Sequence, residues 1–217
     1  MSIMFDDIKN DSTLLGYIKS ADLSLYNLGF TEHNIAHVTH TMNDAIMLLK
    51  SLEYDEHTIE LTKIACYLHD TGNLISRYQH NLFGGVLIAP KLLELGLSAE
   101  DTALIVNAIA SHDKPPGNPT TPIAAALIIG DKSDVRKSRV RKQNLSTFDI
   151  HDKVNYSTLS SKLEINNNDI TLNVILNTEY STKLDFYEIF LDRMLLCREA
   201  ANILGCEFHL DIKEVSE

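Results

Sequence analysis

The chain has 217 residues, is 44% hydrophobic and carries a formal net charge of −11 at pH 7. Its length and hydrophobic content suffice for one buried core, while its charge repels polyanions and argues against a broad nucleic-acid-binding surface. No apolar run approaches the ~18 residues that span a bilayer, and the N-terminal segment is acidic where a signal peptide is basic, so we expect a cytoplasmic protein that has no contact with membranes.

Hydrophobic residues recur at helical spacing through the first two thirds of the chain. Each predicted helix begins or ends at a histidine or an aspartate. The helical segments and their polar ends are 38–49 after His37, 61–68 before His69-Asp70, 104–109 before His112, and 122–128 before Asp131. Pro122 is suited to the first turn of the last helix. Helix ends around one core can converge, so we expect these polar side chains to lie close together.

The hydrophobic period changes from helical to alternating after about residue 157. The elements expected from there on are a β-hairpin over 163–176 that turns at Asn166–Asp169, a helix from about Lys183 that ends at Gly205, and a strand over 208–212. The predicted fold class is therefore mainly α. A helical domain is expected over residues 1–146, followed by a small β-β-α-β element within residues 147–217.

The residues at the predicted helix ends are of the types that bind a metal. His80 lies in the connection just after His69-Asp70 and extends this set, while His40, one helical turn from His37, is the main rival ligand. Neutral imidazoles together with carboxylates suit a borderline divalent ion, whereas a cage of oxygens alone would suit magnesium or calcium. The expected cofactor is therefore one or two divalent ions of manganese, iron, cobalt or zinc.

Five segments over about residues 20–135 resemble the ordered signature of the HD phosphohydrolase superfamily. They are HVTHTMNDA from His37, YLHDTGN around His69-Asp70, HNLFGG from His80, AIASHD around His112, and IIGDKSD around Asp131. A little-characterised bacterial and archaeal branch is more similar still, and its shared stretches are TEH-x-x-x-H from Thr31, DKSDV-x-x-SRVR from Asp131 and FDIHD-x-VNY from Phe148. This resemblance covers nearly the whole chain and implies an HD-type helical bundle, but it implies no particular substrate.

The resemblance also implies a metal centre. The implied ligands of one ion are His37, His69, Asp70 and Asp131. In members with two ions, Asp70 bridges them and His80 and His112 bind the second. The implied reaction is hydrolysis by a metal-activated water, with His80 or His112 contacting the phosphate or moving a proton if one ion is bound. We expect two ions, the second bound more weakly because it has fewer anionic ligands.

A basic stretch between Lys132 and Lys142 holds six cations against one acid. Such a run is commonly a solvated helix face, and that interpretation stays open. Its start beside Asp131 favours contact with substrate phosphates instead. The predicted phosphate contacts are Lys132, Arg136, Arg139 and Arg141, and the candidate catalytic residues are Asp70, His80, His112 and Lys132.

Four further histidines are assigned less directly. His33 and His151 belong to the stretches shared with the more similar branch, and each either orients a metal ligand, caps a helix or touches substrate. His57 and His209 are most simply surface or structural residues. The C-terminal element, about residues 158–213, is expected to be structural or dimer-forming and to supply no metal ligand.

The expected function is metal-dependent hydrolysis of a phosphate ester in a small molecule, with nucleotides as the leading class. The main alternative is a non-catalytic sensor that binds a nucleotide through the same metal site. A nuclease is a weaker alternative, because so acidic a chain has a single short basic stretch. A homodimer is compatible with the sequence.

Overall fold

The computed structural model describes residues 4–114 and 117–216. Its helices and strands, in chain order, are α1 (Phe5–Asn10), α2 (Ser12–Asn27), α3 (Ile35–Ser51), α4 (Glu56–Leu68), α5 (His80–Leu95), α6 (Ala99–Ser111), α7 (Pro122–Ser133), α8 (Ile150–Ser157), β1 (Thr158–Asn166), β2 (Asp169–Asn177), α9 (Lys183–Ile203) and β3 (Glu207–Val215). This order confirms the expected fold class, mainly helical with a small C-terminal sheet. Within the described residues, no helix is long and apolar enough to cross a membrane.

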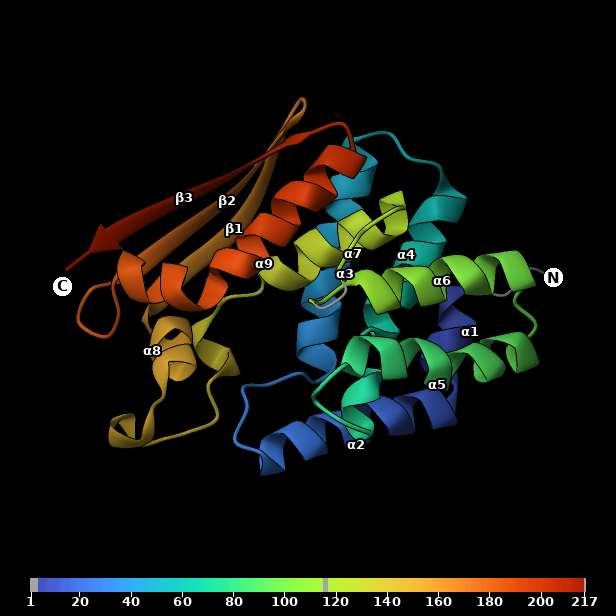
Figure 1. Ribbon diagram of the computed structural model, residues 1–217, viewed down its shortest axis with the longest axis horizontal. Coiled ribbons are helices and arrows are strands. Elements are labelled where there is room, and N and C mark those ends of the chain that lie inside the picture. The colour runs from blue at the N-terminus through green and yellow to red at the C-terminus, as the bar shows by residue number, and fades with distance from the viewer. Residues whose placement is uncertain (1–3, 115–116, 217) are drawn as a thin grey trace.

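Helix α7 is the central helix of the molecule and contacts α3, α4, α6 and α9 (Figure 1). Its residues from Ile123 to Gly130 are all buried, as expected for a helix that is hydrophobic on every side. A Cβ atom at Gly130 would lie 2.4 Å from the carbonyl oxygen of Thr41 in α3. The absence of a side chain at Gly130 therefore lets α7 lie directly against α3, whose first turn holds His37.

Capping side chains set where the helices that carry the candidate ligands begin. Asn34 accepts hydrogen bonds from the backbone N–H groups of Ala36 and His37, so α3 begins two residues before His37. Asp55 caps α4, Ser98 caps α6, and the hydroxyl of Thr121 caps α7 with proline at the first helical position. Capping fixes the phase of each helix, and hence the direction in which its polar end residues point.

The C-terminal element has the predicted order of hairpin, helix and strand. β1 and β2 pair antiparallel through a turn in which Asn167 has a φ of 53°, and β3 adds to β2 in parallel. Helix α9 begins with a capping box between Thr182 and Asp185, and the chain leaves it through Gly205, whose φ is 70°. It lies between the sheet and α7 (Figure 1), so one face of α9 points towards the helical domain.

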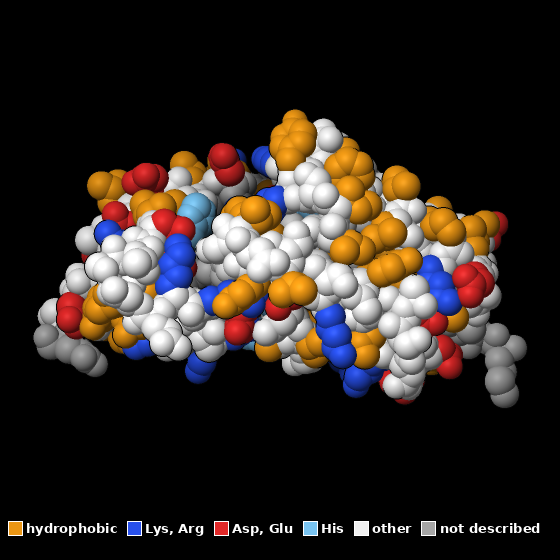
Figure 2. Space-filling model, turned by 90° about the horizontal axis from the view of Figure 1, so that it is seen from below, with side chains coloured by type: hydrophobic (Ala, Val, Ile, Leu, Met, Phe, Trp, Pro, Cys, Tyr) orange, Lys and Arg blue, Asp and Glu red, His pale blue; other side chains and the backbone are white. Residues whose placement is uncertain are grey.

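Two short 3-10 helices, Lys137–Arg139 and Leu145–Thr147, connect α7 to α8, and a third, Thr71–Leu74, follows α4. The face of the molecule in Figure 2 carries hydrophobic side chains scattered over α2 and α5, with basic and acidic side chains dispersed among them. On that face, the basic side chains form no continuous strip of the kind that follows a polynucleotide backbone.

Candidate metal centre

Four side chains from three helices meet at the centre of the helical domain. His37 comes from the first turn of α3, His69 and Asp70 follow the end of α4, and Asp131 lies in the last turn of α7. Nε2 of His37 lies 3.2 Å from Oδ1 of Asp131 and 3.6 Å from Oδ2 of Asp70. Nε2 of His69 lies 3.3 Å from Oδ2 of Asp70 and 3.7 Å from Oδ1 of Asp131. The structure thus brings together the four residues predicted to bind one ion.

The imidazole rings are fixed by hydrogen bonds at their other nitrogen. Nδ1 of His69 donates to the carbonyl oxygen of Cys66 at 2.8 Å, and Nδ1 of His37 donates to Oδ2 of Asp134 at 2.7 Å. Because Nδ1 carries the proton in each ring, the lone pair of the neutral ring is on Nε2 and points into the centre. Asp134 therefore orients a candidate ligand, a role that the sequence did not reveal.

The atoms that face the centre have no hydrogen-bonding partner among the described residues. They are Nε2 of His37, Nε2 of His69 and Oδ2 of Asp70, and all three are buried. Buried polar atoms without a partner are costly unless a ligand satisfies them. An ion with bonds of about 2.1 Å places neighbouring ligand atoms about 3.0 Å apart in an octahedron and about 3.4 Å apart in a tetrahedron. The observed separations of 3.2–3.7 Å therefore fit a divalent ion.

A second group of ligands adjoins the first through Asp70. Nε2 of His80 lies 3.4 Å from Oδ1 of Asp70 and 3.1 Å from Nε2 of His112. Nδ1 of His80 donates to the carbonyl oxygen of Arg77, and Nδ1 of His112 donates to that of Ile109. Two Nε2 lone pairs then face each other, and burial lowers the pKa of His80 to about 4 and that of His112 to about 3, so protonation does not relieve the repulsion. A second cation bound between the two Nε2 atoms would relieve this repulsion.

His80 reaches this position differently from the sequence expectation. It is the first residue of α5 and does not belong to the connection. A Cβ atom at Gly72 would lie 1.9 Å from the carbonyl oxygen of His80 and 2.4 Å from the backbone nitrogen of Gly84. The turn after Asp70 therefore packs against the start of α5, and this contact holds His80 beside Asp70.

The proton balance of metal binding gives a direct prediction. Burial lowers the pKa of His69, but the negative charges of Asp70 and Asp131 outweigh it and raise this pKa to about 10. At about pH 7.5, the first ion must displace that proton, so its binding should release about one proton and strengthen as the pH rises. The second ion should release almost none, because His80 and His112 are already neutral. Calorimetry in two buffers of different protonation enthalpy measures both values, and proton release confined to the second ion would contradict the assignment.

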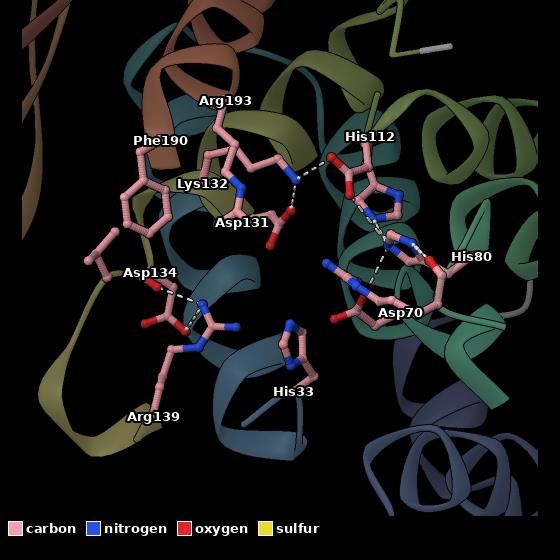
Figure 3. Close-up of a pocket in the computed structure, with 13 residues that line it drawn as sticks. His33, Asp70, His80, His112, Asp131, Lys132, Asp134, Arg139, Phe190 and Arg193 are labelled. Carbon is pink, nitrogen blue, oxygen red and sulfur yellow. Dashed lines mark hydrogen bonds and ion pairs between the residues drawn. The ribbon is translucent and has the colours of Figure 1, made fainter. Parts of the chain in front are cut away.

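A cavity opens beside the centre, and its lining includes most of the predicted site residues together with several that were missed (Figure 3). Nζ of Lys132 is buried and lies 2.6 Å from Oδ2 of Asp131 and 3.5 Å from Oδ1 of Asp113. Arg139 also lines the cavity, and its guanidinium donates to the carbonyl oxygens of Glu32 and Asp134. Two of the four predicted phosphate contacts therefore lie at the cavity.

The other two predicted phosphate contacts are engaged elsewhere. Arg136 forms an ion pair with Asp134, with its Nε 2.7 Å from Oδ1, and Arg141 pairs with Asp22 and stacks on the ring of Tyr26. Neither belongs to the described lining of the cavity. The basic stretch thus divides into a buried part at the site and a part whose side chains pair with Asp134 and Asp22.

Of the remaining histidines, three lie near the centre or its cavities and two lie at the surface. The ring of His33 lies 5.4 Å from that of His37 and lines the cavity, while Nε2 of His40 lies 3.6 Å from Asp134, behind His37. His151 lines an adjoining cavity. His57 and His209 are exposed and pair with Asp101 and Asp169, respectively.

Sequence reasoning missed Asp113, Arg77, Phe190 and Arg193, all of which line the cavity. Asp113 follows His112 directly, so its position in the sequence could have predicted it as a site residue. Phe190 and Arg193 lie on α9, in the element expected to be only structural or dimer-forming, and this expectation was incomplete. Nothing in the local sequence of α9 indicates that its inner face reaches the metal centre.

Comparison with known proteins leaves the family of the chain open. No protein-family model matches it. The chain is 26% identical to the uncharacterized protein MJ1020 of Methanocaldococcus jannaschii, over 82% of this chain and 77% of that relative. It is also similar to the crystal structure of a predicted HD superfamily hydrolase from an uncultured Thermotogales bacterium, with 21% identity, a TM-score of 0.46, and coverage of 57% of this chain and 67% of that one. The function is therefore argued from the site itself.

Proposed function

We propose that this protein is a metal-dependent phosphohydrolase of the HD superfamily, acting on a phosphate ester of a small molecule in the cytoplasm, with nucleotides as the leading class. The observation that carries the proposal is the set of buried ligand atoms on His37, His69 and Asp70 that lack a hydrogen-bonding partner among the described residues. Buried polar atoms that contact neither water nor a hydrogen-bond donor are costly, and a bound cation would remove that cost. The ordered HD-type motifs in the sequence support the same assignment.

The residues around the centre suit a phosphoryl substrate. A bound divalent ion would lower the pKa of a water molecule and polarise a phosphoryl oxygen. Lys132, whose pKa is raised by Asp131 and Asp113 against the opposing effect of burial, keeps its positive charge at the cavity. Asp113, whose pKa the charge of Lys132 lowers against burial, stays ionised between Lys132 and His80. Lys132 can bind a phosphate oxygen, and Asp113 can orient a water molecule or accept its proton.

The ion count distinguishes a one-ion from a two-ion site. We expect metal-free protein titrated with manganese or iron to take up two ions per chain, the second more weakly, because Asp70 is the one carboxylate among its ligands. The double variant His80→Ala/His112→Ala should take up one. Elemental analysis after removal of free metal gives the count. Saturation at one ion in both proteins would leave the two histidines as phosphate-binding or proton-transfer groups.

Release of phosphate from a nucleotide panel tests the function. Metal-dependent turnover of at least one small phosphate ester, lost when metal is removed and restored when it is returned, is the expected result. Tight nucleotide binding without turnover would favour the alternative, a non-catalytic sensor that uses the same metal site. Cleavage of a polynucleotide with steep salt dependence would favour a nuclease instead.

A further inference from the structure

Three arginines from separate segments converge on the space above the metal centre. Arg77 follows the 3-10 helix after Asp70, Arg139 ends the 3-10 helix after α7, and Arg193 lies on α9. All three line the cavity at the metal centre and also the adjoining cavity, which His33 and Phe190 share. Figure 3 shows Arg139 and Arg193 on opposite sides of the open space that Asp131 and Asp70 face. The arginines therefore lie where the two cavities adjoin.

Two of these arginines have no acidic partner among the described residues. Arg77 donates one hydrogen bond, to Oδ1 of Asn73 at 3.3 Å, and Arg193 forms neither a hydrogen bond nor an ion pair with any residue that the structure describes. By contrast, Arg139 lies 3.7 Å from Oδ2 of Asp134 and donates to two carbonyl oxygens. The guanidinium groups of Arg77 and Arg193 thus keep nearly all of their donors for another molecule.

Aromatic rings hold both free guanidinium groups in place. The guanidinium carbon of Arg77 lies 5.5 Å from the centre of the Phe30 ring, and that of Arg193 lies 4.8 Å from the centre of the Phe190 ring. Stacking on an aromatic ring restrains the planar group without using its N–H donors. Such an arrangement is prepared to bind an oxyanion with two parallel hydrogen bonds from each arginine.

The charges of the three arginines act on one another. Burial lowers the pKa of Arg193, Asp113 and Asp131 raise it, and the positive charges of Arg77 and Arg139 lower it again. Cations gathered in a partly buried space without enough acidic partners are costly unless an anion binds between them. Four acids line the cavity, and each has another role: Asp70 and Asp131 face the proposed ions, Asp113 pairs with Lys132, and Asp134 pairs with Arg136 and Arg139. A further anion must therefore come from a ligand.

We propose that Arg77 and Arg193 bind a second phosphoryl group of the substrate, beside the one held at the metal centre, so the preferred substrates carry two linked phosphates. This inference rests on the proposed function. Arg77 is close to the metal ligands, because it lines the same cavity as Asp70 and His80. A group bound between Arg77 and Arg193 would therefore be adjacent to a phosphate on the ions, which favours a diphosphate over two distant phosphates. The adjoining cavity leaves room for the rest of the molecule.

The test compares two non-hydrolysable probes by calorimetry on manganese-loaded protein. Methylenediphosphonate should bind about 10- to 100-fold more tightly than methylphosphonate, because two arginines add charge-assisted hydrogen bonds. The variant Arg77→Gln/Arg193→Gln should lose most of this preference, and the single variants Arg77→Lys and Arg193→Lys should lose part of it. Arg198→Gln is the matched control, because Arg198 lies on the same helix as Arg193 but is exposed. Its preference should equal that of the unchanged protein.

The outcomes separate this inference from the proposed function. Equal affinity for the two probes, or a preference that survives in the double arginine variant, would overturn the second phosphate site while leaving metal-dependent phosphate release intact. Absence of both probe binding and phosphate release in the unchanged, metal-loaded protein would instead overturn the proposed function. Melting curves and metal content show whether each variant is folded and loaded with manganese. If the double variant is not folded, the two lysine variants test the second phosphate site in its place.

Discussion

Replacing Asp70 with asparagine should remove bound metal and phosphate release together. Asp70 faces both groups of candidate ligands, through Oδ2 towards His37 and His69 and through Oδ1 towards His80. An amide is a weaker metal ligand than a carboxylate and lacks its charge. The loss should exceed the ~10- to 100-fold that follows removal of a group which only supports a ligand. Elemental analysis and phosphate release at saturating substrate measure the two effects.

The matched control is Asp101→Asn, which makes the same chemical change at a carboxylate 2.9 Å from an exposed histidine, His57. Because this pair lies at the surface, away from the described lining of the cavity at the metal centre, metal content and activity should be unchanged. Full metal occupancy in Asp70→Asn would show that the centre has been assigned to the wrong residues. Equal losses of metal and activity in Asp70→Asn and Asp101→Asn would show that the losses do not depend on the proposed metal centre.

The substitution Gly72→Ala should strongly destabilise the protein and displace His80. The added Cβ would lie 1.9 Å from one backbone atom and 2.4 Å from another, and neither can rotate away as the end of a side chain can. Overpacking of a core typically costs about 1–3 kcal/mol, and contacts this close with backbone place the expected cost at about 3 kcal/mol or more. Denaturant unfolding of the metal-free protein measures it, and the remaining folded protein should bind the second ion more weakly.

The substitution Gly16→Ala should have the opposite effect on stability. A Cβ atom at Gly16 would have no neighbour within 4 Å in the described parts of the chain, and the residue lies inside α2. Alanine there should stabilise the protein by about 0.5–1 kcal/mol, because glycine is a poor helix former. If Gly72→Ala were as stable as Gly16→Ala, the tight contact between the turn after Asp70 and α5 would not exist as described.

The sequence predicted those parts of the fold that depend on local pattern. Apolar stripes that end in His69-Asp70, His112 and Asp131 located three helix ends, and the switch to alternation located the hairpin and the last strand. Capping made these boundaries sharp, with α9 beginning at Lys183 as expected. Convergence of the helix ends could be anticipated, because each polar end residue continues a buried face.

Residues whose role depends on tertiary contacts were not predictable in this way. The sequence could not show that Arg136 and Arg141 pair with Asp134 and Asp22 while Arg139 reaches the cavity, since all three belong to one basic stretch. Arg193 is far from the motifs in sequence and enters the site because α9 packs against α7. Such residues become visible when the segments are assembled in space.

Anomalous scattering from crystals of the protein, purified without chelator and supplied with manganese, tests the metal centre most directly. We expect a strong peak within bonding distance of Nε2 of His37, Nε2 of His69 and the carboxylates of Asp70 and Asp131. A second, weaker peak is predicted beside His80 and His112. Density without an anomalous peak at these residues, or a peak confined to the exposed group Asp169, Glu207 and His209 on the C-terminal sheet, would contradict it.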